Sequence, residues 1–149
     1  MQVVFNSSKF ALEGLVEGSH YELKGLGIEN VLLQPGAFPT ELSAKTMTGS
    51  DESVVEAYGE IAQIPAKMGE SLHQLFNSEH APNPELVSEA MLKLIETPRG
   101  ERPLRTVVDP LTGQFAEKAN EEVFTQYKNF AGAFGMGELL ADEKVEAEA

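Results

Sequence analysis

Apolar residues recur at three- and four-residue spacing along the first part of the chain, with charged residues between them. In residues 3–26 these apolar positions are Leu12, Leu15, Val16, Leu23 and Leu26. The period predicts an amphipathic helix, which Gly25 and Gly27 end. Within it, Gly14 and Gly18 each cost roughly 1 kcal/mol relative to alanine. We therefore expect another backbone to pack closely against this small-residue face.

Two short apolar runs without helical spacing follow later in the chain. Residues 28–34 lie between Gly27 and the turn Pro35-Gly36, and residues 104–108 stop at Asp109-Pro110. Their length and punctuation predict buried strands. Helical patterns over 84–95 and 113–131 surround the second run. The order of elements predicts an α/β fold with about two parallel strands and flanking helices.

The segment from Pro35 to Asn83 is too long for a plain connection, so we expect it to carry helices of its own. Asp51 is placed to cap a helix that contains Val54 and Tyr58. Pro65 is expected to interrupt this helix, and the apolar stripe continues to Phe76.

Composition and charge exclude several classes of partner. The chain has 149 residues and a formal net charge of −13, which disfavours binding to nucleic acid or to an anionic membrane surface. It contains no cysteine, no long apolar run and no signal-like start. A cytoplasmic setting without membrane insertion fits best, and residues 141–149, with four acids and one lysine, are expected to be a disordered tail.

Four other sets of residues that could suggest different chemistry have simpler interpretations. Ser7, Ser8 and Lys9 lie too close in sequence for a Ser-x-x-Lys pair. Glu70 and His73 have the Glu-x-x-His spacing of di-metal bundles, but no second copy occurs, so we expect no metal site. His20 and His80 are isolated, and we expect them to face solvent. The glycines of residues 132–137 follow no strand and are interpreted as a helix end.

Two segments resemble the short-chain dehydrogenase/reductase family. Residues 5–14 (FNSSKFALEG) resemble its active-site helix with the pattern Tyr-x-x-x-Lys, and residues 31–40 (VLLQPGAFPT) resemble its cofactor turn Pro-Gly-x-x-x-Thr. The similarity extends over about residues 4 to 110. Phe5 stands where the family has its catalytic tyrosine, so the general acid or base is missing while Lys9 is kept.

The resemblance implies a role for each matching residue. Lys9 would contact the nicotinamide ribose, Phe38 would offer backbone groups to the carboxamide, and Thr40 would offer its hydroxyl nearby, after the turn at Pro35-Gly36. The cofactor would be NAD or NADP, which this chain alone is not expected to bind tightly. Residues 41–80 would be a lid over a hydrophobic substrate, although their apolar stripe equally suits a plain core.

The resemblance also implies a fold and an organisation. Residues 1–140 would form one partial Rossmann-like domain, the C-terminal portion of a doubly wound fold. Its parts would be the active-site helix and cofactor strand (1–36), the lid excursion (37–82), a helix with the last strand (83–110) and a C-terminal helix (111–140). The glycine-rich turn and catalytic serine of the family have no counterpart in this sequence.

Two functions follow as hypotheses. The first is a truncated NAD(P)-dependent oxidoreductase of carbonyl or alcohol groups, inactive as this chain alone. The alternative is a non-catalytic protein-interaction module derived from that fold. In either case we expect a homo-oligomer or a complementing N-terminal half as the partner.

Overall fold

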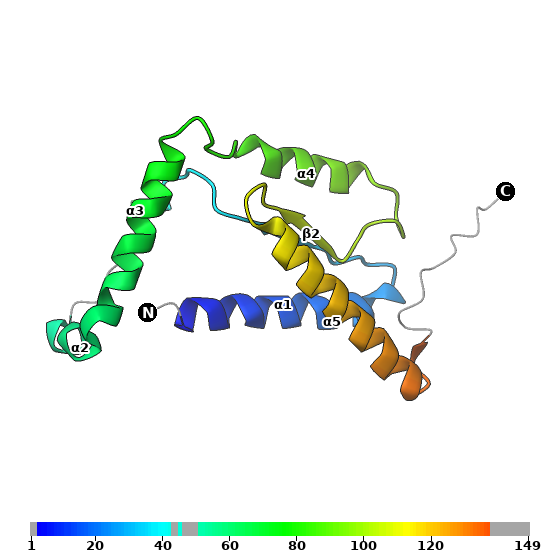
Figure 1. Cartoon of the computed structure of the whole chain (residues 1–149). Coiled ribbons are helices and arrows are strands. Elements are labelled where there is room, and N and C mark those ends of the chain that lie inside the picture. The colour runs from blue at the N-terminus through cyan, green and yellow to red at the C-terminus, as the bar shows by residue number, and fades with distance from the viewer. Residues whose placement is uncertain (1–2, 43–44, 46–50, 138–149) are drawn as a thin grey trace. The chain divides into compact units, whose positions relative to one another are not determined.

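The computed structural model describes residues 3–42, 45 and 51–137 (Figure 1). The chain divides into two compact units. One, which we call the excursion unit, is Ala37–Pro84, and the other, the sheet unit, comprises Gln2–Gly36 and Glu85–Ala149. The expected acidic tail, 141–149, lies outside the described residues.

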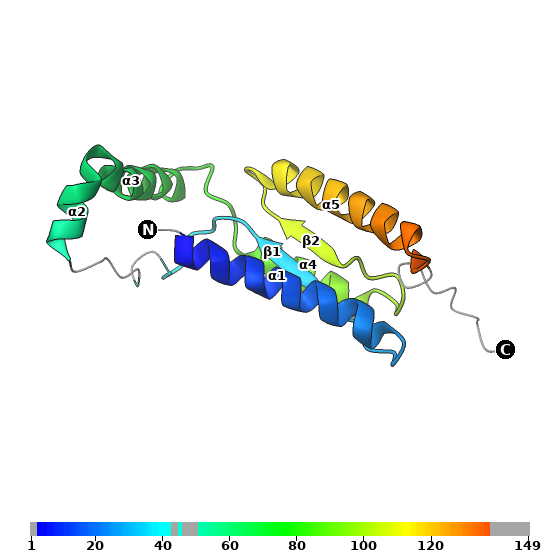
Figure 2. The ribbon, with the colours of Figure 1, turned by 90° about the horizontal axis from the view of Figure 1, so that it is seen from below.

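The sheet unit has three layers. Its elements are α1 (Val3–Lys24), β1 (Leu32–Pro35), α4 (Glu85–Glu96), β2 (Arg105–Val108) and α5 (Gly113–Ala133). The two strands pair in parallel, with Leu32 opposite Arg105 and Pro35 opposite Val108. Helix α4 covers one face of this sheet, and α1 and α5 cover the other (Figures 1 and 2). The prediction of an α/β fold with two parallel strands and flanking helices is therefore confirmed.

Strand β1 begins later than the apolar pattern suggests. The prediction placed it at 28–34, whereas the observed strand is Leu32–Pro35. Ile28, the first residue of the predicted run, closes the end of α1 instead. Its N–H donates to the carbonyl of Leu23 (3.2 Å). Backbone groups that satisfy a helix end are not available to a strand ladder.

The sheet unit buries few apolar side chains. Among the described residues the buried apolar ones are Leu32, Leu94 and Ala131. On α1, by contrast, Phe10 is 80% exposed and Leu15 is 68% exposed. A Cβ added at Gly14 or Gly18 would meet nothing within 4 Å. The close packing expected against these two glycines is therefore absent within the described part of the chain.

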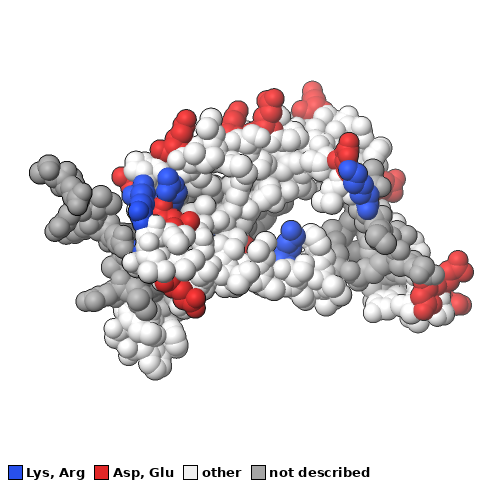
Figure 3. All heavy atoms as spheres, turned by 180° about the vertical axis from the view of Figure 1, so that it is seen from behind, with Lys and Arg blue, Asp and Glu red and all other residues white. Residues whose placement is uncertain are grey.

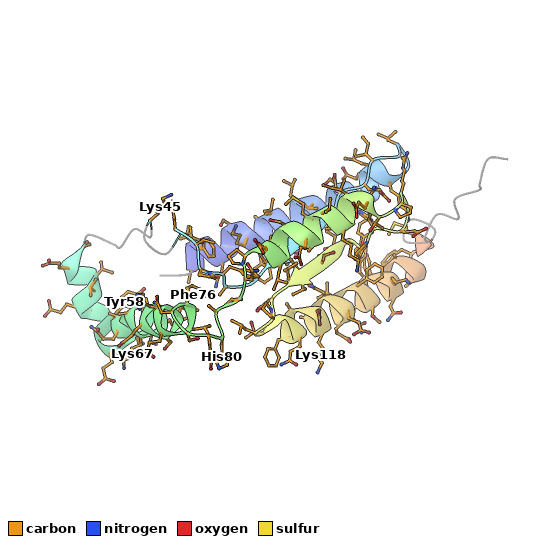
Figure 4. The ribbon with its side chains drawn as sticks, turned by 90° about the horizontal axis from the view of Figure 1, so that it is seen from above. Lys45, Tyr58, Lys67, Phe76, His80 and Lys118 are labelled. Carbon is orange, nitrogen blue, oxygen red and sulfur yellow. The ribbon has the colours of Figure 1, made fainter. Side chains whose placement is uncertain are left out.

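The excursion unit is helical, as predicted. It contains α2 (Glu52–Tyr58), the 3-10 turn η1 (Gly59–Gln63) and α3 (Ile64–Phe76), with Tyr58 and Lys67 toward one end and Phe76 at the other (Figure 4). The Asp51 cap is confirmed, since its Oδ1 accepts from the N–H groups of Ser53 (3.0 Å) and Val54 (3.4 Å).

The break in this helical excursion is not where the sequence placed it. Pro65 lies in the first turn of α3, where a residue without an N–H is tolerated. The helix is interrupted at Gly59 instead, whose φ of +55° favours glycine and ends α2. The predicted interruption of the helix is therefore present, but it covers residues 59–63 and ends just before Pro65.

None of the helices within the described ranges is long and apolar enough to cross a membrane.

Candidate functional site

Phe5 and Lys9 lie together on the amino half of α1. This half of the helix extends toward the carboxyl ends of the two strands (Figure 2). Residues four apart share a helix face, and the Lys9 Nζ lies 5.4 Å from the centre of the Phe5 ring. The ring is 56% exposed. The pair is a cation–π contact that carries a donor at Lys9 but no transferable proton at position 5.

The turn after β1 is shaped by Asp109, the residue that follows β2. The Gly36 N–H donates to the carbonyl of Val108 (3.0 Å), which extends the ladder by one bond. A Cβ at Gly36 would come within 2.3 Å of the Asp109 Cγ and 2.6 Å of its Cβ. Position 36 therefore requires glycine for a steric reason that the sequence alone did not reveal.

Asp109 itself is held by the chain that leads into α5. Its Oδ1 accepts from the N–H groups of Leu111 (2.9 Å) and Thr112 (3.1 Å), and its Oδ2 accepts from the Thr112 hydroxyl (2.6 Å). Burial by itself raises the pKa of Asp109, but these hydrogen bonds outweigh it and hold the pKa below the usual range. The carboxylate thus stays ionised beside the turn at Gly36.

Phe38 and Thr40 belong to the excursion unit. The Thr40 hydroxyl oxygen accepts from the Leu42 N–H at 3.4 Å. The predicted site residues therefore fall into two sets. The structure brings Phe5 beside Lys9, and it places Pro35 and Gly36 at the end of β1. Phe38 and Thr40 belong to the other compact unit, the excursion unit.

A network of polar side chains, which the sequence pattern did not predict, connects the sheet to its helices. Glu13 accepts from the Gln34 amide (2.6 Å) and from Arg105 Nε (3.0 Å), while Gln34 in turn accepts from the Asn120 amide (2.7 Å). Arg105 also donates to Glu17 (3.0 Å). The network links α1, β1, β2 and α5, and it sets the position of the helix that carries Phe5 and Lys9.

Arg105 is the centre of that network. Burial alone would lower the pKa of Arg105, but hydrogen bonds to the Glu17 and Glu13 carboxylates raise it. The signal available in the sequence was an arginine opening an otherwise apolar strand, together with two glutamates four apart on one helix. Neither feature shows which residue will pair with which, because the paired residues are 92 and 88 positions apart in the sequence.

Tyr21 is the tyrosine of α1, but it is unsuited to acid–base work at neutral pH. Burial and the charge of Glu17 raise the pKa of Tyr21 to about 12. Its hydroxyl is buried. The ring stacks on Tyr127, with centroids 5.1 Å apart. Tyr21 therefore packs α1 against α5 and does not replace the missing hydroxyl at position 5.

The other constellations behave as ordinary structure. The Ser8 hydroxyl donates to the carbonyl of Phe5 (2.7 Å), and the Asn77 amide donates to the carbonyl of His73 (2.7 Å). No cluster of three His, Asp or Glu side chains suited to a metal occurs among the residues that the structure describes. The glycine-rich segment 132–137 forms the end of α5, as expected. His20 differs from its expectation, since it is half-buried and its Nδ1 lies 2.8 Å from the carbonyl oxygen of Asn30.

The fold and this site define an α/β protein with a lysine at the carboxyl edge of a parallel sheet. No protein-family model matches the chain. Over 93 residues the chain is 29% identical to a Bacillus subtilis (strain 168) protein named uncharacterized oxidoreductase YusZ. The match covers 52% of this chain and 33% of that relative, so the chain spans about a third of the relative's length. This similarity supports a relationship to oxidoreductases.

Proposed function

We propose that the chain is the C-terminal part of a nicotinamide-dependent short-chain dehydrogenase/reductase whose catalytic tyrosine is replaced by Phe5. The observation that carries the proposal is the pairing of Phe5 with Lys9 on a helix that leads into β1 and its Pro35-Gly36 turn. The similarity to a protein named as an oxidoreductase supports the same assignment.

In this proposal the chain supplies the nicotinamide half of a cofactor site. Ligands of open α/β sheets bind outside the carboxyl ends of the strands, the edge toward which α1 brings Lys9. Lys9 would donate to the ribose of NAD or NADP, and the turn at Pro35 and Gly36 would approach the ring, followed by Phe38 and Thr40. When bound, the reduced cofactor NADH or NADPH would supply the hydride for a carbonyl substrate, and this chain's residues would bind and orient its nicotinamide end.

The proposed site lacks a side chain that can transfer a proton to or from the substrate. A tyrosine at position 5 would hold a hydroxyl beside an ammonium group, which lowers its pKa and suits it to proton transfer. Phe5 has no such proton, and Tyr21, with a pKa of about 12, cannot substitute for it. The chain by itself is therefore proposed to be inactive in hydride transfer between carbonyl and alcohol groups.

The excursion unit is proposed to act as a substrate lid. Its helices leave apolar side chains exposed, among them Ile61 (63%), Ile64 (50%) and Met68 (48%). Exposed apolar side chains on a helical segment suit contact with a hydrophobic substrate.

A specific observation also favours a second function, that of a non-catalytic protein-interaction module. The apolar side chains of α1 are largely exposed, with Val4 at 81% and Phe10 at 80%. Large apolar patches of this kind mark sites of protein contact. The partner would be a second copy of the chain or a complementing N-terminal half.

The coding sequence upstream of residue 1 separates the two functions. A reading frame that encodes a glycine-rich turn after a strand, and then a serine about a dozen residues before Phe5, would support the oxidoreductase. Its absence, together with a stably folded chain of 149 residues, would favour the interaction module.

A further inference from the structure

The amino end of the sheet, opposite to the edge that carries Lys9, has two adjoining hollows. The larger is a cleft of about 310 Å³, lined by the end of α1, the start of β2 and α5. The smaller is a hollow of about 50 Å³ between the end of α1 and the loop that joins α4 to β2. His20, Lys24 and Arg102 line both of them, so the two spaces adjoin.

The cleft has an aromatic wall. Tyr21 and Phe124 line it, and Pro103 and Leu104 add apolar surface. Tyr21 is held rigidly, because it stacks on Tyr127 and meets the ring of His20 edge-on at 5.3 Å. Fixed rings of this kind favour a flat ring as the occupant. The cleft volume lies at the lower end of the range for small-molecule sites, roughly 300–1,000 Å³.

The smaller hollow has a basic wall in a strongly acidic protein. All three arginines of the chain line the two hollows, and Lys24 joins them. In the smaller hollow, Lys24, Arg99 and Arg102 lie around one carboxylate, that of Glu29, which forms its ion pair with Arg102. Basic side chains gather at this end of the molecule in the space-filling view (left side of Figure 3).

The arginines of the smaller hollow differ in the hydrogen bonds that they donate within the chain. Arg102 is committed to the fold, since it donates to Glu29 and to the carbonyl of Leu94 (2.8 Å). The Arg99 guanidinium lies over Gly27, where an added Cβ would meet its Nη2 at 1.8 Å. Arg99 acts on the Glu29 carboxylate through its charge, but it donates no hydrogen bond to a residue that the structure describes, so its planar set of donors can meet an anion.

We propose that these two hollows bind one small aromatic anion, with its flat ring in the cleft beside Tyr21 and Phe124 and its phosphate or carboxylate group at Arg99. Glu121, which lines the cleft, sets this orientation because its carboxylate repels an anionic group placed there. The site is separate from the candidate cofactor site. Lys9 and Lys24 are fifteen residues apart on α1, which corresponds to about 22 Å along a helix.

Phenyl phosphate is the probe. Phenol represents its ring alone, and inorganic phosphate represents its anionic group alone. The full chain is titrated with all three by calorimetry or by chemical-shift mapping. Phenyl phosphate should bind at least about tenfold more tightly than either half, since it gains both the ring contact and the charge-assisted hydrogen bonds. Equal affinity for phenyl phosphate and inorganic phosphate would overturn the proposal, as would absence of saturation below about 10 mM.

Substitutions of the lining residues test whether phenyl phosphate binds in these hollows. Arg99→Met should weaken the binding of phenyl phosphate by roughly tenfold, the loss typical of a hydrogen bond to a charged group. Phe124→Leu should weaken phenyl phosphate about threefold and leave inorganic phosphate unchanged. Lys118→Met removes a positive charge from an exposed position of α5 that lines neither hollow, and it should change neither affinity. Equal losses in Lys118→Met and Arg99→Met, with unchanged thermal melting, would show that the probe binds elsewhere and would overturn the site.

Discussion

Arg105 at the start of β2 forms an ion pair with Glu17 of α1, with 3.0 Å between Nη2 and Oε2 across 88 positions of the chain. The arginine side chain is only 10% exposed, and Glu13 accepts from its Nε at the same distance. With few apolar side chains buried in the sheet unit, this polar contact is a main tie between α1 and the sheet.

Replacing Arg105 with methionine should destabilise the chain by about 2 kcal/mol, because Glu13 and Glu17 would be left partly buried without a counter-charge. Urea unfolding followed by circular dichroism measures this change. Lys45→Met is the matched control, since its ion pair with Glu41 is 71% and 83% exposed and should contribute less than about 0.5 kcal/mol. Equal effects of the two substitutions would contradict the role assigned to Arg105.

Asp109 should make the stability of the chain depend on pH in the acid range. Its pKa is lower in the folded chain than the ordinary aspartate value, so its contribution is complete above about pH 4 and is lost as the pH falls through the folded-state pKa. Asp109→Asn keeps an acceptor but removes the titration. Melting temperatures measured below pH 4 should therefore fall less steeply in this variant than in the parent chain, and parallel curves would refute the assignment.

Local pattern predicted much of the sheet unit, and long-range contacts account for what it missed. Helices α1 and α5 follow the spacing of their apolar residues, and strand β2 follows the length and the flanking residues of its apolar run, because these signals are local in sequence. The start of β1 did not, since the backbone of Ile28 closes α1 instead. At the site, the Phe5 and Lys9 pairing follows from helical spacing, whereas the requirement for Gly36 depends on Asp109, 73 positions later in the sequence.

The chain by itself should not bind NADH or NADPH with useful affinity. Lys9, Pro35, Gly36, Phe38 and Thr40 could contact only the nicotinamide half, and a pyrophosphate-binding turn has no counterpart in this sequence. Titration followed by cofactor fluorescence should show no saturation below about 1 mM, which corresponds to roughly −4 kcal/mol. Saturation at micromolar cofactor would contradict this account of the site.

The exposed apolar surface predicts self-association. In the described part of the chain β1 pairs with β2 alone, and an unpaired strand edge can accept another strand. Burying one apolar side chain is worth about 1.5–3 kcal/mol, so covering several on α1 would outweigh the cost of association. We expect either a dimer that pairs the α1 helices, with Gly14 and Gly18 at the contact, or a loosely packed monomer.

Light scattering after size-exclusion chromatography distinguishes these states, with melting measured over a hundredfold range of concentration. A dimer should melt at a higher temperature as concentration rises, and a loose monomer should melt broadly. Gly14→Leu should shift a dimer toward monomer, whereas Gly69→Ala, on α3, is a control expected to leave the association unchanged. A monodisperse monomer with a sharp, concentration-independent transition would mean that the sheet unit is self-sufficient.

If Phe5 occupies the place of a catalytic tyrosine, restoring the hydroxyl at position 5 should restore proton transfer. The chain is fused behind the N-terminal segment of a short-chain dehydrogenase/reductase that carries the glycine-rich turn and serine, and cofactor fluorescence establishes that the fusion binds NADH or NADPH. Phe5→Tyr should then raise the turnover of a carbonyl substrate by about 10²–10⁴-fold, the usual contribution of a positioned acid or base, and Lys9→Ala in the same background should lower it again. A fusion that binds cofactor but turns over equally fast with Phe5 and with Phe5→Tyr would contradict the claim.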